Sequence, residues 1–149
     1  MIKNIYFTNK KKTTNMKIEK FMLIWLISFI ILVIFDMLWF VVSIPTVYKP
    51  LFNDIQKKFI FRVWSGIVVW VLIGLFIAMD QCWTIKTAPF DPRILGFIYG
   101  FIIYGVYNFT NYATIYKYNL KVVFTDTLWG SLNIGMTTLI IHYLLRSMR

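Results

Sequence analysis

The amino-acid sequence predicts an all-α membrane protein, a four-transmembrane-helix bundle with both termini in the cytoplasm. Of its 149 residues, 59% are hydrophobic and only 15% are charged, a balance too apolar for a soluble domain of this length. The apolar residues also gather into four long segments, each able to cross a hydrocarbon core of about 30 Å. These segments and their loops use nearly the whole chain, which predicts one transmembrane domain over residues 21–145.

A basic polar tail, residues 1–20, precedes the first apolar segment. It has no apolar periodicity, which predicts a flexible or interfacial segment. Its lysines could each contribute about 1 kcal/mol of attraction near an acidic leaflet, so anionic lipid is an expected partner beside the bilayer itself. Nucleic acid is not expected despite the net charge of +10, because the lysines at 10–12 lack interleaved aromatic residues.

The first predicted span, residues 21–44, is interrupted only by Ser28, Asp36 and Ser43. At about 1.5 Å per residue it reaches roughly 36 Å, enough to span the core with some tilt. A cleaved signal peptide is the competing interpretation. It fails because the apolar run is longer than about 15 residues and no small-residue cleavage site follows Ile44.

The remaining spans are predicted at residues 59–79, 94–116 and 122–145. All four prolines fall between the predicted spans, as expected for a residue that breaks helices. They are Pro45, Pro50, Pro89 and Pro92.

Orientation follows from the distribution of Lys and Arg. Ten of these residues lie in the tail, the middle loop and the C-terminus, against six in and beside the other two loops. The positive-inside rule therefore predicts that both termini face the cytoplasm.

Small residues at four-residue spacing predict where helices approach closely. Gly96 and Gly100 form a GxxxG motif in the third span, and Ser131 and Gly135 repeat the spacing beside Gly130 in the fourth. We interpret these residues as packing positions within the bundle in preference to a dimer interface, although a homo-oligomer stays open.

Polar side chains of the spans converge on the outer half of the bilayer. Three helix faces carry them, with i, i+3 and i+4 spacings that would turn each set inward. Placing a polar side chain inside the bilayer is costly, so each one is expected to face a partner or a cavity. We therefore predict a polar pocket that binds a lipid headgroup or a small solute. Its predicted residues are Asp36, Trp39, Tyr107, Asn108, Asn111, Asp126 and Trp129. The opposite half is expected to be almost purely apolar, which argues against an ion channel.

Two alternatives remain beside the pocket. The polar residues could simply join helices through hydrogen bonds in a structural or assembly protein, or an aspartate could act as the acid or base of a lipid-modifying enzyme or its accessory subunit. No catalytic residue is identified, because His142 lies far along its span from both aspartates. With one histidine and one cysteine, Cys82, no metal site and no cofactor is expected.

Three motifs resemble those of a known family. They are Phe35-Asp36-Met37-Leu38-Trp39, Tyr107-Asn108-Phe109-Thr110-Asn111-Tyr112-Ala113-Thr114 and Thr125-Asp126-Thr127-Leu128-Trp129-Gly130. In this order they resemble the four-helix membrane proteins of domain of unknown function 2177, over roughly residues 21–145. The resemblance implies no known activity. Its pattern has an acid where this chain has Asn108, which puts a proton-transfer role there in doubt but keeps the hydrogen bonding.

Residue usage rich in Ile, Lys, Asn, Phe and Tyr is typical of an AT-rich genome, such as that of a large DNA virus or a reduced bacterium. A viral source would place the protein in a host or virion membrane.

Overall fold

The computed structural model describes residues 2–84 and 91–147, with side chains described for residues 18–82, 91 and 93–147. In these ranges the chain is helical and contains no strand. The elements are α1 (Ile2–Ser43), η1 (Ile44–Tyr48), α2 (Lys49–Gln56), α3 (Val63–Met79), η2 (Asp80–Thr84), α4 (Pro92–Thr114) and α5 (Leu120–Ser147). Four helical stretches are long and apolar enough to cross a membrane, which confirms the predicted fold class.

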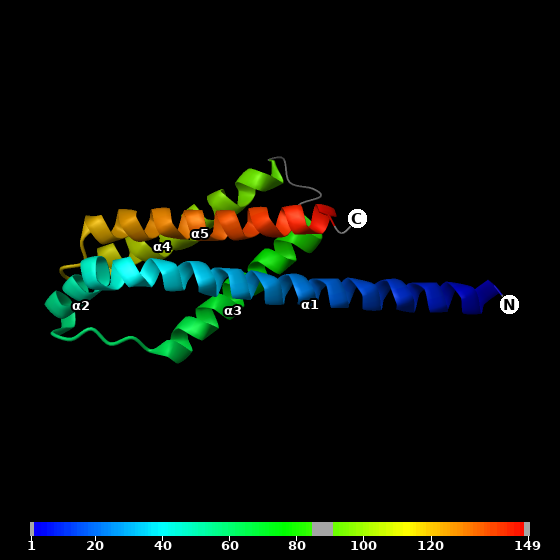
Figure 1. The fold of residues 1–149 in the computed structure, drawn as a ribbon, viewed down its shortest axis with the longest axis horizontal. Helices are drawn as coiled ribbons and strands as arrows, with labels where there is room; N and C mark the ends of the chain where they lie inside the picture. The colour runs from blue at the N-terminus through cyan, green and yellow to red at the C-terminus, as the bar shows by residue number, and fades with distance from the viewer. Residues whose placement is uncertain (1, 85–90, 148–149) are drawn as a thin grey trace.

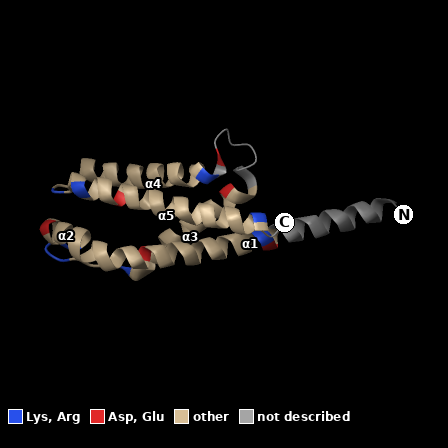
Figure 2. Ribbon diagram, turned by 45° about the horizontal axis from the view of Figure 1, so that its top comes forward, with Lys and Arg blue, Asp and Glu red and all other residues tan. Residues whose placement is uncertain are grey.

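Two helix pairs build the bundle. α4 and α5 form its most extensive contact, while α1 packs on α3 and α5. α3 crosses the other helices obliquely, and α5 ends at the opposite end of the bundle from α2 (Figure 1). Lys and Arg residues lie at the ends of the bundle (Figure 2). The middle of each helix presents apolar side chains outward, such as Ile34, Leu72 and Leu128, each more than half exposed. This is the surface that lipid tails would cover.

The first helical run extends beyond the expected span at both ends, because α1 begins before residue 21 and the chain continues as helix through η1 and α2. It begins at Ile2, where the sequence predicted a flexible or interfacial tail, and no Gly or Pro interrupts it before Pro45. The chain also stays helical through Pro45 and Pro50, which we expected to break it. Each proline lies at the beginning of its element, where a missing N–H costs little. Between them the helix widens to the π register of η1.

The remaining boundaries differ from expectation by a few residues. The helix ends at Lys57, whose φ of 63° is left-handed, and residues 59–62 form an irregular stretch, so α3 begins four residues later than predicted. Asp91 begins α4 by accepting hydrogen bonds from the backbone and guanidinium of Arg93. Those bonds hold the pKa of Asp91 at about 2.

Glycines allow α4 and α5 to pack closely. A Cβ built on Gly100 would lie 2.5 Å from the carbonyl oxygen of Gly130 and 2.7 Å from the Cα of Ser131. Gly96 faces the side chain of Thr138 in the same way, and Gly135 lies against the ring of Phe97. The motif glycines in the described part of the chain therefore face a neighbouring helix of the same bundle.

Candidate polar binding site

Asp36 is the first of two buried carboxylates that line one cavity. It lies on α1 and is 6% exposed. Its oxygens accept hydrogen bonds from the indole N–H groups of Trp70 on α3 and Trp129 on α5, at 2.6 and 2.8 Å, and from the side-chain amide of Asn133 at 2.7 Å. One side chain thus ties three helices together, because indole and amide N–H groups buried in a membrane need acceptors.

Asp126 on α5 is the second. It accepts the hydroxyl of Tyr48 from η1 and the side-chain amide of Asn108 from α4, the latter at 2.7 Å. Asn108, which is fully buried, also accepts the hydroxyl of Tyr118 at 2.7 Å. Burial raises the pKa of Tyr118 to about 12, so its phenol remains a donor across the physiological range.

Two tryptophans connect these carboxylate centres. The rings of Trp39 and Trp129 are stacked, with centroids 4.7 Å apart and planes 8° from parallel. Trp39 donates its N–H to the hydroxyl of Tyr48 at 3.4 Å, on the Asp126 side, whereas Trp129 donates to Asp36. The network therefore continues from the middle of the bundle to the turn before α5.

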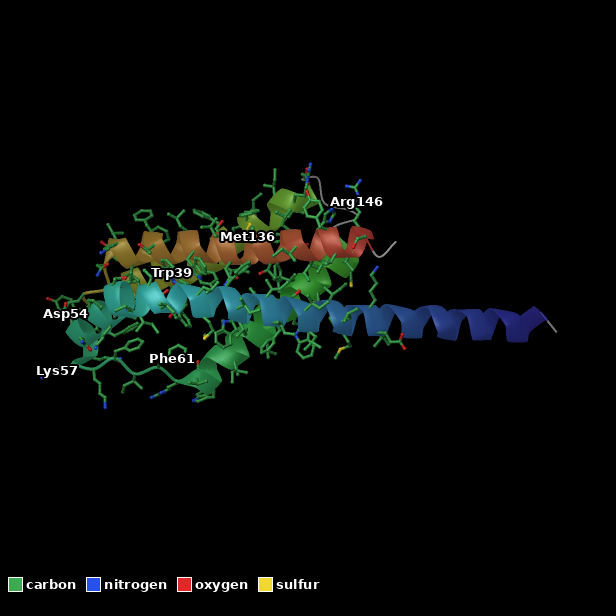
Figure 3. All side chains as sticks on the ribbon, in the orientation of Figure 1. Trp39, Asp54, Lys57, Phe61, Met136 and Arg146 are labelled. Atoms are coloured by element: carbon green, nitrogen blue, oxygen red, sulfur yellow. The ribbon has the colours of Figure 1, made fainter. Side chains whose placement is uncertain are left out.

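A cavity of about 670 Å³ lies against this network. Asp36, Trp39, Tyr107, Asp126 and Trp129 line it, as do parts of α3 and the stretch before it. The labelled side chains Trp39 and Phe61, both from its wall, lie toward the same end of the bundle (Figure 3). The structure thus places five of the seven predicted pocket residues on one cavity.

The other two predicted residues lie outside the lining. Asn108 is behind Asp126 and reaches the cavity only through its hydrogen bonds to Asp126 and Tyr118. Asn111 is half-buried, and its backbone carbonyl accepts the N–H of Ile115 at the end of α4. That any of the seven binds a ligand remains a prediction.

The predicted pocket residues omit several polar members of the site, among them Asn133, whose amide donates to Asp36. Tyr48 and Tyr118 were placed in loops, although η1 and the α4–α5 turn return them to the bundle. Trp70 lies in the middle of the second span, too deep for an interfacial belt, and an indole N–H at that depth requires an acceptor. That depth was the available signal for Trp70.

Neither buried aspartate has a basic partner. In the described ranges, ion pairs join Arg93 to Asp91 at 2.5 Å and Lys117 to Asp54 at 3.0 Å, all on exposed or half-exposed side chains. Arg62 lines the cavity from the stretch before α3. The described residues also contain no group of three His, Cys, Asp or Glu side chains that could hold a metal ion.

The expectation of an almost purely apolar inner half needs correction. Ser28, Thr137, Thr138 and Asp80 are buried there, and the hydroxyls of Ser28 and Thr137 have no hydrogen-bond partner among the described residues. Small hydroxyl residues suit close helix contacts. They scarcely alter the hydropathy of a span, so the hydropathy pattern does not reveal them. An apolar cluster has side chains between these buried hydroxyls and Asp36. It consists of Leu32, Trp70, Ile73, Ile77 and Ile134.

The comparisons with known proteins agree with the fold. The model of the family described as "Predicted membrane protein (DUF2177)" matches residues 21–143, which confirms the resemblance seen in the three motifs. No curated protein and no solved structure matches the chain.

Proposed function

We propose that this chain, which belongs to the DUF2177 family of predicted membrane proteins, binds a small polar group in the cavity beside Asp36 and Asp126. The observation that carries this proposal is that Asp36 and Asp126 line one open cavity. The same two carboxylates also accept hydrogen bonds from side chains of neighbouring helices. The group is a lipid headgroup or a small solute.

The size and lining of the cavity support binding. Its volume of about 670 Å³ lies within the 300 to 1,000 Å³ typical of small-molecule sites. Such sites are mostly apolar and aromatic with a few convergent polar groups. Here Phe40, Tyr104 and Trp129 supply aromatic surface, while the two carboxylates supply polar atoms.

A purely structural role accounts for part of the network but not for the cavity. Asp36 joins α1, α3 and α5, so it would fix the bundle even in a protein without a ligand. An interhelical hydrogen bond contributes on average about 0.6 kcal/mol in membranes. The open cavity beside both carboxylates is the part of the site that helix packing alone does not require.

Filling the cavity tests the proposal. A Cβ on Gly66 would meet Phe61 and Trp70 only at 3.5 Å or more, so Gly66→Leu would place its side chain in the cavity without displacing backbone. Val68→Phe, on the lipid-facing side of the same helix, is the matched control. We expect native mass spectrometry to show a retained molecule on the wild type and the control but not on Gly66→Leu. Equal retention by all three would contradict the proposal.

We also propose that the cavity end faces away from the cytoplasm. The excess of Lys and Arg supports a cytoplasmic location for the tail and the end of α5. η1 and α2, which supply part of the cavity lining, lie toward the other end of the bundle (Figure 1). If the source is a large DNA virus, the membrane is a host or virion membrane. A reporter that is active only outside the cytoplasm, fused after Arg149, should be inactive, and its activity there would reverse the orientation.

The basic tail supports a contact with anionic lipid on the cytoplasmic side. Replacing Lys10, Lys11 and Lys12 by Gln should reduce retention of acidic lipids by the purified protein. Retention equal to that of the wild type would show that the tail is not the lipid contact.

A further inference from the structure

We infer that the ligand is an aminophospholipid, held with its primary ammonium group between Asp36 and Asp126. This inference rests on the proposed function and adds the chemical class of the ligand. Three features of the cavity carry it: carboxylate acceptors without a basic partner, aromatic walls, and a cationic rim beside an apolar opening.

Asp36 and Asp126 offer acceptor oxygens, and no basic residue in the described ranges is paired with them. A carboxylate has about four lone-pair positions, of which protein donors take three on Asp36 and two on Asp126. Both side chains line the cavity, and neither is paired with a basic residue in the described ranges. A primary ammonium brings three N–H donors and one positive charge, so it matches the vacant acceptors and compensates the carboxylates.

The walls favour an organic cation over a metal ion. Calcium and magnesium take six or more oxygen ligands, whereas many of the residues that line the cavity with the two carboxylates are aromatic. Aromatic faces attract ammonium groups, and the attraction grows when the group is shielded from water. The rings on the cavity include those of Trp39, Trp70 and Trp129.

The rim adds a site for a phosphate. Arg62 lines the cavity at the beginning of α3, and no ion pair in the described residues occupies it. A guanidinium binds phosphate oxygens through paired N–H donors. The carboxyl groups of Asp36 and Asp126 and the guanidinium of Arg62 thus complement a headgroup that carries an ammonium at its tip and a phosphate behind it.

The cavity also opens sideways to lipid tails. Leu72 lines it and is nevertheless 58% exposed on the face of α3 that meets the bilayer. Val69, Ile60 and Ile103 continue this apolar wall. α3 contacts α4 through Phe76 and Tyr99, toward the end away from the cavity, and its oblique path carries it away from the pair α4 and α5 (Figure 1). An acyl chain can lie along this apolar wall, which Leu72 continues to the surface of α3.

The test compares lipids that differ only in the headgroup. The full-length protein is exchanged into detergent and titrated with phosphatidylethanolamine, phosphatidylcholine or phosphatidylglycerol of one acyl composition, and native mass spectrometry reports the bound fraction. We expect phosphatidylethanolamine to bind about tenfold more tightly than the other two, because only its headgroup supplies ammonium donors. Ethanolamine without acyl chains is measured in parallel and should bind more weakly than phosphatidylethanolamine, because it does not use the apolar opening. An affinity equal to that of phosphatidylethanolamine would assign the site to a free amine.

A variant pair isolates the carboxylate. Asp126→Asn keeps a side chain of the same shape and an acceptor for Tyr48 but removes the charge, so it should abolish the preference for phosphatidylethanolamine. Asp54→Asn removes an exposed carboxylate on α2 that does not line this cavity, and it should leave the preference intact. Equal binding of all three lipids to the wild type, lost in Gly66→Leu, would overturn the ammonium inference and keep the proposed function. Binding of none would overturn the aminophospholipid inference, and the proposed function would fall with it only if the wild type also retained no more of any molecule than Gly66→Leu.

Discussion

Asp36 and Trp129 are 93 residues apart in sequence, and a 2.8 Å hydrogen bond between them joins α1 to α5 in the polar middle of the bundle. The same carboxylate oxygen accepts the amide of Asn133, while the other oxygen accepts the indole of Trp70. The first span is thereby held to two other spans by one residue. Asp36 accepts three side-chain hydrogen bonds from two other helices.

Replacing Asp36 by Leu should therefore destabilise the bundle. Three donors lose their acceptor, and at about 0.6 kcal/mol for each interhelical bond the free energy of unfolding should fall by about 2 kcal/mol. Asp36→Asn, which keeps one acceptor oxygen, should cost less. Reversible unfolding in mixed micelles measures both, with Met37→Leu on the exposed face of α1 as the control. An unfolding free energy of Asp36→Leu equal to that of the control would show that the bonds carry no stability.

Packing of α4 on α5 gives a second prediction. Gly100→Ala should lower the free energy of unfolding by about 1 to 3 kcal/mol, because the new Cβ would overlap backbone atoms of Gly130 and Ser131 that cannot rotate away. Gly105→Ala is the matched control on the same helix, since its Cβ would meet only a methyl group of Thr127 at 3.7 Å. If the two variants unfold alike, the close approach at Gly100 is not a constraint.

Tyr118 predicts a titration at high pH. Its pKa is raised by burial from 10.0 to about 12, so the folded protein retains this proton after the unfolded chain has lost it. The stability that this creates is fully present below about pH 10 and is lost as the pH rises toward 12. The ultraviolet phenolate spectrum of the wild type minus that of Tyr118→Phe should show a step near pH 12. A step near pH 10 would mean that the hydroxyl is open to water.

The sequence predicts the spans and the depth of the polar cluster well, because both depend on a local quantity, the cost of placing each side chain in lipid. Asp36 and Asp126 stand out in apolar surroundings for this reason. The same quantity misses Ser28 and Thr137, whose small hydroxyls scarcely alter hydropathy although their side chains are buried.

Partners across the bundle are harder to predict because they depend on distant segments. Nothing local to Tyr48 indicates that its hydroxyl meets Asp126, 78 residues away. Pro45 adds to the difficulty, since the same residue ends a helix in one context and begins a π turn in another. The path of α3, which opens the cavity, is set by packing against α1 and has no signature in the sequence.

The departure of this chain from its family pattern can be tested at Asn108. The family resemblance implies an acid at this position, but here the amide donates to Asp126 at 2.7 Å and its oxygen accepts the hydroxyl of Tyr118. Asn108→Asp would set two carboxylates face to face, with no donor between them unless they share a proton. We expect the variant to be less stable than the wild type near neutral pH and to recover much of that loss in acid, where a shared proton restores the hydrogen bond. Asn108→Leu provides the control, because its loss should not depend on pH. Wild-type stability of Asn108→Asp at neutral pH would instead show that this bundle already admits a proton at the site, as the family motif requires.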